Sequence, residues 1–264
     1  MIGWQKPFRG TQLNKTHPLA RNLLLAYLLN ENSGDIAYIQ GVNRAGTIVN
    51  GTWDNGKLTF AGNGYVSLPN PNIPEIGTGP YTVFARIKIP ASVSSVYPYV
   101  FGFDAYDPTW FITNGETHRM SVYDDGDYSS PSTYIFAANA VYDIAFVRDS
   151  SGILHFYYAK AGEGSHKETP ILGHIDESVN IPTIIRLGTD TAGYMTGSVY
   201  FQLLYNREIS LAEFDLLHRE PYCMFTRALD IGAMLYAVPV VGGSIINQFQ
   251  KANLGADLFN GSLI

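Results

Sequence analysis

The sequence has little charge and no long apolar run. Only 15% of its 264 residues are charged, the formal net charge is −6, and no cluster of Lys and Arg is present. Nucleic acids and anionic lipid surfaces attract proteins mainly through such clusters. We therefore expect no nucleic-acid partner. No run of about 18 apolar residues exists to span a bilayer, so we also expect no membrane insertion.

The sequence contains a single cysteine, Cys223, which excludes an intramolecular disulfide framework. Its neighbours are Tyr222 and Met224, so we interpret it as a small buried apolar residue. No His or Asn is identifiable as the partner of a catalytic thiol. The N-terminus, MIGWQKP, lacks the apolar stretch of a secretory signal peptide, so we expect synthesis in a cytoplasm without that export route.

Glycine and aromatic residues are abundant, with 26 Gly, 18 Tyr and 14 Phe. Short alternating or apolar runs lie between Gly, Asn and Pro, which is typical of strands joined by turns. The predicted strands are Leu23–Leu29, Thr47–Val49, Lys57–Phe60, Tyr65–Leu68, Tyr81–Ile89, Tyr97–Phe103, Trp110–Ile112, Met120–Tyr123, Tyr134–Ala137, Val141–Arg148, Ile153–Tyr158, Ile184–Leu187 and Val199–Tyr205. We expect an all-β fold, a two-layer antiparallel β-sandwich of the jelly-roll type with extended terminal arms.

Local signals add detail to this expectation. The pairs Asn50-Gly51 and Asn55-Gly56 are strong markers of hairpin turns. The alternation in Tyr81–Ile89 predicts one buried face and one wetter face.

One short helix is predicted after the last long strand. Ser210 with Glu213 three residues later forms a capping-box pattern, and Pro221 ends the helix. Glu213 and Asp215 point about 200° apart at helical spacing. We interpret these two residues and His218 as a solvated helix face.

Three segments resemble the concanavalin A-like, laminin G-like jelly-roll superfamily. They are AYLLNENSGDIAYIQGVNRAGTIVNGTWDNGKLTFAGNGYVSLP (residues 26–69), YDIAFVRDSSGILHFYYAKAGEG (142–164) and GSVYFQLLYNREISLAE (197–213). The resemblance covers roughly residues 23–225 and implies the sandwich fold. The opening WQKPFRGTQLNKTHPLARNLLLAYLLNE is similar to those of phage-encoded laminin G-like proteins.

The resemblance also carries expectations about chemistry. Glycoside hydrolases on this fold generally place a Glu-x-Asp-x-x-Glu array on one strand. This chain has no such array. We therefore expect no catalytic residues and a chain that is not an enzyme.

Laminin G-like domains often hold calcium, which prefers carboxylate and carbonyl oxygens. The expected metal-site residues are the acidic ones in FDAYDP and DDGDYSS, namely Asp104, Asp107, Asp124, Asp125 and Asp127. The alternative is an Asp-Gly turn between two strands, without metal.

A glycan site needs exposed aromatic faces beside hydrogen-bonding groups. Tyr106, Trp110, Tyr123 and Tyr128 lie near the acidic loops and are the expected glycan-binding residues. The alternative is that these rings belong to the core, as most rings in a sandwich do.

Three regions are expected: an N-terminal arm (1–22), the jelly-roll domain (23–230) and a C-terminal arm (231–264). Ile231–Gln250 has no charged residue, so we expect it to pack on its own domain or on another subunit. The first expectation for function is a structural protein of a phage virion (decoration, fibre or tail component), joined to itself or to other virion proteins through its arms and possibly touching host glycans. The alternatives are a glycan hydrolase or lyase with an unrecognised site, and a free carbohydrate-binding module.

Overall fold

The computed structural model describes residues 6–7, 11–40, 44–69, 76–89, 91, 99–103, 109–113, 118–124, 127–128, 132–169, 184–188 and 196–226. For β7, β8, β10, β14 and residues 123–124 of β9 the description covers the backbone only. The chain divides into two units, Met1–Thr226 and Arg227–Ile264. The second unit, and with it the expected C-terminal arm 231–264, lies outside the described residues.

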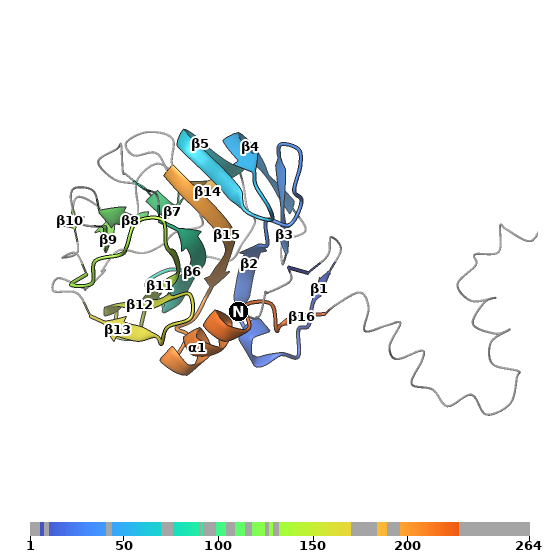
Figure 1. Ribbon diagram of the computed structural model, residues 1–264. Coiled ribbons are helices and arrows are strands. Elements are labelled where there is room, and N and C mark those ends of the chain that lie inside the picture. Colours follow the sequence, from blue (N-terminus) through green and yellow to red (C-terminus); the bar gives the residue numbers. More distant parts are fainter. Residues whose placement is uncertain are drawn as a thin grey trace, which may run out of the picture. The chain divides into compact units, whose positions relative to one another are not determined.

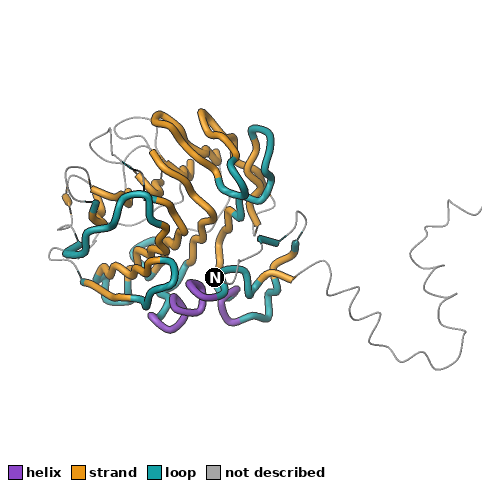
Figure 2. Tube along the Cα trace, viewed as in Figure 1, coloured by secondary structure: helices purple, strands orange, loops and turns teal. Residues whose placement is uncertain are grey.

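Strands make up most of the described chain (Figure 2). They are β1 (Gln12–Leu13), β2 (Leu23–Tyr27), β3 (Ile36–Gln40), β4 (Arg44–Trp53), β5 (Leu58–Pro69), β6 (Tyr81–Lys88), β7 (Tyr99–Phe103), β8 (Thr109–Thr113), β9 (Arg119–Asp124), β10 (Asp127–Tyr128), β11 (Val141–Arg148), β12 (Leu154–Lys160), β13 (His166–Glu168), β14 (Ile184–Gly188), β15 (Thr196–Tyr205) and β16 (Phe225–Thr226). The helical elements of the described residues are the 3-10 helix η1 (Pro18–Ala20) and the α-helix α1 (Leu211–Arg219). No helix in the described ranges is both long and apolar enough to cross a membrane.

Fourteen of the described strands form one antiparallel sheet in the order β10-β9-β8-β7-β14-β5-β4-β3-β2-β15-β6-β11-β12-β13 (Figure 1). The sheet folds back on itself, because β15 pairs with β2 and β6 and also, through residues 196–199, with β5. The short strands β1 and β16 pair separately. The prediction of an all-β sandwich is therefore confirmed.

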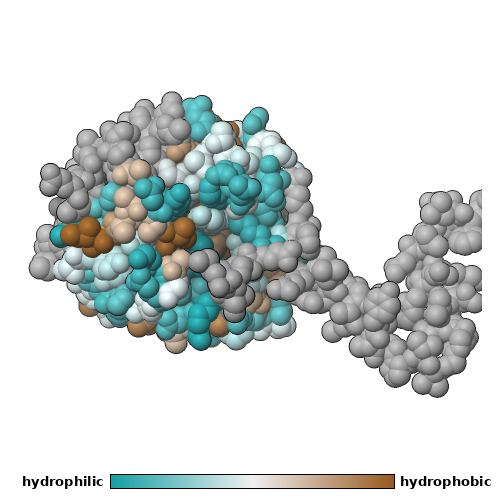
Figure 3. All heavy atoms as spheres, in the orientation of Figure 1, coloured by the Kyte–Doolittle hydropathy of each residue, from teal (hydrophilic) through white to brown (hydrophobic). Residues whose placement is uncertain are grey.

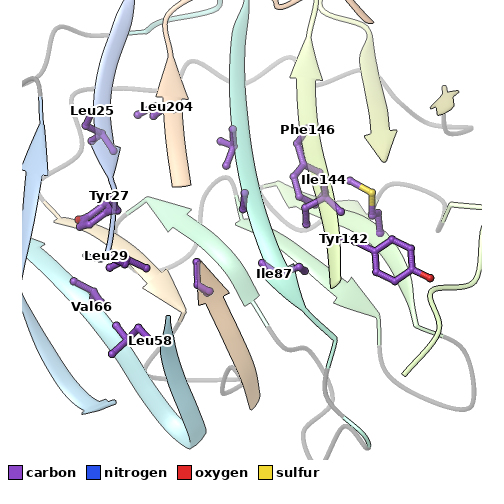
Figure 4. Packing of buried hydrophobic residues seen from close by; sticks show 14 of the residues in the cluster. Leu25, Tyr27, Leu29, Leu58, Val66, Ile87, Tyr142, Ile144, Phe146 and Leu204 are labelled. Carbon is purple, nitrogen blue, oxygen red and sulfur yellow. The ribbon is translucent and has the colours of Figure 1, made fainter. Parts of the chain in front are cut away.

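The main core lies between the two layers of the sheet. It takes Met120 and Val122 from β9, Leu58 and Val66 from β5, and Phe146 from β11, so strands far apart in the sheet order share one cluster. Figure 4 shows side chains of β2, β5, β6, β11 and β15 filling this space. This packing is what stacks the two layers.

A second buried cluster lies on the other side of β6, β11, β12 and β15. Phe84 of β6 packs against Phe201 of β15 and Phe214 of α1, with ring centroids 5.6 and 5.5 Å apart. Both faces of β6 are therefore covered. The predicted wetter face of Tyr81–Ile89 holds for the half-buried Arg86 and Lys88 but is wrong for Thr82 and Phe84, because the alternation in the sequence does not reveal that a helix covers the outer side.

The two Asn-Gly pairs behave differently. Asn55 and Gly56 have φ of 48° and 76°, and Asp54 and Lys57 exchange backbone hydrogen bonds around them, as in a two-residue hairpin. Asn50 also has a positive φ, 49°, but it lies inside β4, where the pairing with β5 shifts register. The predicted turn at Asn50-Gly51 is therefore a bulge.

Some strand boundaries differ from those expected. The predicted strands Lys57–Phe60 and Tyr65–Leu68 belong to one strand, β5. The predicted strand Tyr134–Ala137 is a loop that makes one isolated bridge, His118 to Phe136. The edge strand β13 was not predicted, because three residues are too few for a periodic pattern.

The predicted helix and its capping box are confirmed. The Ser210 hydroxyl accepts from the Glu213 backbone N–H at 3.2 Å, and the Glu213 carboxylate accepts from the Ser210 backbone N–H at 2.9 Å. These bonds fix where α1 begins and thus how it lies over the second cluster.

We predict that Ser210→Ala lowers the free energy of unfolding by about 1 kcal/mol, because the Glu213 backbone N–H loses its acceptor. Urea unfolding measures the change. Ser210→Thr, which keeps the hydroxyl, is the matched control and should lie within a few tenths of a kcal/mol of the wild type. Equal stability of all three proteins would contradict the role given to the cap.

Candidate functional site

The structure describes five of the nine expected site residues, each by its backbone. Trp110 lies in β8, Tyr123 and Asp124 in β9, and Asp127 and Tyr128 in β10. The other four lie outside the described residues: Asp104, Tyr106, Asp107 and Asp125.

The strand register brings some of these positions together. Tyr123 is directly opposite Tyr128, and Asp124 is opposite Asp127. In the register of β8 and β9, Trp110 pairs with Val122, a core residue. The side chains lie outside the description, so the glycan and calcium assignments stay predictions.

The chain after β10 continues along β9. The Ser132 backbone N–H donates to the Met120 carbonyl at 2.8 Å, and the Phe136 N–H donates to the His118 carbonyl at 2.8 Å. The segment 132–137 is thereby held at the edge of the sandwich. It carries Tyr134 toward β12 and β13.

Three nearly parallel rings lie at this edge, and we name Tyr134, Tyr158 and His166 the aromatic rim. Tyr134 stacks on Tyr158 with centroids 4.6 Å apart and planes at 29°. Tyr158 and His166 are cross-strand partners whose ring centroids are 5.3 Å apart, with planes at 21°. Tyr158 is buried, Tyr134 is half-buried and His166 is exposed.

Polar groups surround the aromatic rim. The Glu168 carboxylate accepts from the Thr133 backbone N–H at 2.5 Å and lies 3.2 Å from the Thr133 hydroxyl. The exposed Glu163 pairs with Lys160 at 2.9 Å. Ile135 beside Tyr134 is 49% exposed. In Figure 3 the described surface is mostly hydrophilic, and its hydrophobic atoms form small patches.

The aromatic rim was not predicted from the sequence. Tyr134 was assigned to a strand, and His166 received no role. A usable signal was the His-x-Glu alternation at 166 and 168, which puts both residues on one face of a strand.

A second constellation, the charge network, lies under α1. Arg86 of β6 donates from Nε and Nη2 to both oxygens of Asp143 on β11, at 2.7 and 2.6 Å. Asp143 Oδ2 lies 2.5 Å from His218 Nδ1 on α1, and Arg86 Nη2 also donates to the His218 carbonyl. Burial of the Arg86 guanidinium acts to lower its pKa. The hydrogen bonds and charge of the Asp143 carboxylate act in the opposite direction, and the pKa of Arg86 is raised.

The polar residues of α1 therefore do not form a solvated face, and that interpretation is wrong. Glu213 pairs with Arg207 at 2.9 Å, Asp215 accepts from the Ser165 hydroxyl, and His218 meets Asp143. An aspartate that orients a histidine through Nδ1 leaves Nε2 available for proton transfer. Within the described ranges, however, His218 has no hydrogen-bonded Ser, Thr or Cys. The charge network joins α1 to β6 and β11 and so holds the helix on the sheet.

A third polar contact holds the N-terminal segment. The Lys6 ammonium donates to the carbonyls of Leu28 and Leu29, each at 2.9 Å, and to that of Tyr200. Asn30 donates to the Pro7 carbonyl at 2.8 Å. Burial lowers the pKa of Lys6 to about 7, while the nearby Glu31 carboxylate acts in the opposite direction.

Among the described residues, no group of three or more His, Cys, Asp or Glu side chains is placed to hold a metal ion. Of the five expected calcium residues, Asp104, Asp107 and Asp125 lie outside the described residues, and Asp124 and Asp127 are described by their backbone alone.

No model of a known protein family matches the chain, and no curated protein matches its sequence. Solved structures do share its fold. A sialidase of Trypanosoma rangeli matches 80% of this chain at 14% identity with a TM-score of 0.55, and the same enzyme in complex with sialic acid matches 80% at 15% identity and 0.55. The receptor binding domain of botulinum neurotoxin C/D mosaic serotype matches 75% at 12% identity and 0.54.

The chain spans about a third of each of these sialidases, 36% of their length, and 51% of the toxin domain. At these identities the likeness shows a shared fold. The expectation that the chain is not an enzyme is nevertheless contradicted, because the structures that share the fold include enzymes. The absence of a Glu-x-Asp-x-x-Glu array excluded one catalytic arrangement and not catalysis as such.

We predict that Asp143→Asn lowers the free energy of unfolding by about 3 kcal/mol, because Arg86 and His218 lose a buried charged partner. Denaturant unfolding measures this loss. The double variant Arg86→Met/Asp143→Leu removes both buried charges and should recover much of it. A single variant as stable as the wild type would show that the network does not hold α1.

We predict that Lys6 makes stability rise with pH. Between about pH 7 and 10.5 the unfolded chain binds a proton at Lys6 that the folded chain lacks, so the free energy of unfolding increases with pH. The difference between wild type and Lys6→Met should rise by up to about 1.4 kcal/mol per pH unit above pH 7. A difference that is constant from pH 6 to 9 would contradict the lowered pKa.

Proposed function

We propose that this chain recognises glycans. The observation that carries the proposal is the fold shared with sialidases, one of them solved with sialic acid bound, and with a toxin's receptor binding domain. The aromatic rim adds independent chemical support, since it offers ring faces and hydrogen-bonding groups at an exposed edge.

The chemistry of the aromatic rim suits sugars. A sugar ring presents C–H groups on one face and hydroxyls around its edge. The C–H face packs on an aromatic ring, and the hydroxyls bond to carboxylates, hydroxyls and backbone groups. Tyr134, His166 and Glu168 provide both kinds of contact within one small region.

Glycan hydrolysis is the second candidate, and the sialidase neighbours favour it. Two of the described carboxylates are paired with arginines and are therefore not free to act as a general acid or base. Asp143 is engaged by Arg86, and Glu213 by Arg207. The expected place in a phage virion rests on the N-terminal resemblance, the lack of a signal peptide and of disulfides, and the long terminal arms, and these neighbours do not test it.

We predict that the full chain, applied to an array of neutral and sialylated glycans, is retained by a defined subset that a heat-unfolded sample does not bind. Absence of retention on every glycan would contradict glycan recognition. Release of reducing sugar or free sialic acid from the same glycans, measured over time, tests the second candidate. Release proportional to protein concentration supports hydrolysis, and none contradicts it.

A further inference from the structure

We infer that the aromatic rim is the sugar-binding subsite and that it takes neutral sugar rings in preference to sialylated ones. This inference rests on the proposed function and assigns it to described residues. It also departs from the ligand named for the sialidase neighbour.

The three rings of the aromatic rim share nearly one orientation. The planes of Tyr134 and His166 lie at 19° to each other, and each is nearly parallel to Tyr158. Because stacked rings cover one another's faces, only the exposed member of the set can offer a ring face to a sugar. His166 is that exposed member, and the half-buried Tyr134 borders it.

Two of the three rings, those of Tyr134 and Tyr158, are already held in place by the core. Tyr158 is 8% exposed and meets Phe136 edge-on at 5.7 Å. Tyr134 meets Phe136 and Tyr142 edge-on, at 5.1 and 6.1 Å, and its hydroxyl is 3.4 Å from that of Tyr142. Binding on such a surface orders few side chains, so little of the contact energy is lost.

Glu168 is placed to accept hydrogen bonds from sugar hydroxyls. Glu168 is held by the Thr133 backbone N–H through Oε1, while Oε2 faces the Thr133 hydroxyl at 3.2 Å. Glu168 lies on the same face of β13 as His166, because the two are separated by one residue. A fixed carboxylate beside a ring face can accept hydrogen bonds from two neighbouring sugar hydroxyls.

The negative charge around the aromatic rim favours neutral sugars over sialylated ones. Glu163 and Glu168 put two carboxylates around the rings, and the chain as a whole has a net charge of −6. Lys160 pairs with Glu163, and Lys167 lies over the Tyr157 ring, which belongs to the cluster on the other face. A sialic acid carboxylate would meet repulsion here without a described arginine to offset it.

The test compares His166→Ala with Tyr38→Ala as full-length chains. Both remove an exposed ring from a strand, but Tyr38 lies on β3 and is 51% exposed there. Binding to immobilised neutral oligosaccharides and to their sialylated counterparts is measured at pH 8. We expect His166→Ala to weaken binding to neutral glycans about three- to tenfold. Tyr38→Ala should bind as the wild type does.

A second variant guards against misfolding. His166→Phe keeps an aromatic ring at this position, so it should recover most of the binding to neutral glycans that His166→Ala loses. Wild-type affinity of His166→Ala for neutral glycans would overturn the aromatic rim as the subsite while leaving glycan recognition intact. A wild type that binds only sialylated glycans would overturn the sugar class. A wild type that binds none would instead overturn the proposed function itself.

Discussion

The buried carboxylate of Asp143 is the constraint on which the outer side of this sandwich depends. It lies on β11 and is bound by Arg86 from β6 and by His218 from α1. A buried carboxylate is tolerated only with such partners, so the three elements must keep their relative positions. Helix α1 is thereby kept over the apolar cluster around Phe84 and Phe214. Without that cover, both-sided burial of the central strands would be lost.

The same arrangement explains where ligand chemistry is left exposed. Central strands are covered on the inner side by the other layer and on the outer side by α1. Among the described strands β13 is the last at this end of the sheet, and the segment 132–137 is held beside β9 by the backbone hydrogen bonds of Ser132 and Phe136. Core aromatics that reach this edge, such as Tyr158, continue outward into the half-buried Tyr134 and the exposed His166. The aromatic rim therefore continues the main core from the buried Tyr158 to an exposed side chain at this end of the sheet.

What the sequence predicted follows from the range of the interactions. The capping box at Ser210 and the turn at Asn55-Gly56 depend on neighbours within four residues, and both were predicted. The bulge at Asn50 was taken for a turn because the same dipeptide serves both, and pairing with a distant strand decides between them. Asp143 and His218 are 75 residues apart, and no local pattern links them. The aromatic rim was not predicted for the same reason, since its three rings come from three separate segments of the chain.

The central claim is that an edge of this sandwich, and not its sheet faces, binds neutral sugars. A chemical-shift titration of the isotope-labelled full chain with a neutral oligosaccharide tests it most directly, because every residue reports separately. The account predicts saturable shifts that are largest at His166, Tyr134 and Glu168, with Tyr38 unaffected. Shifts that do not saturate, or that are largest around Tyr38 on β3, would contradict it.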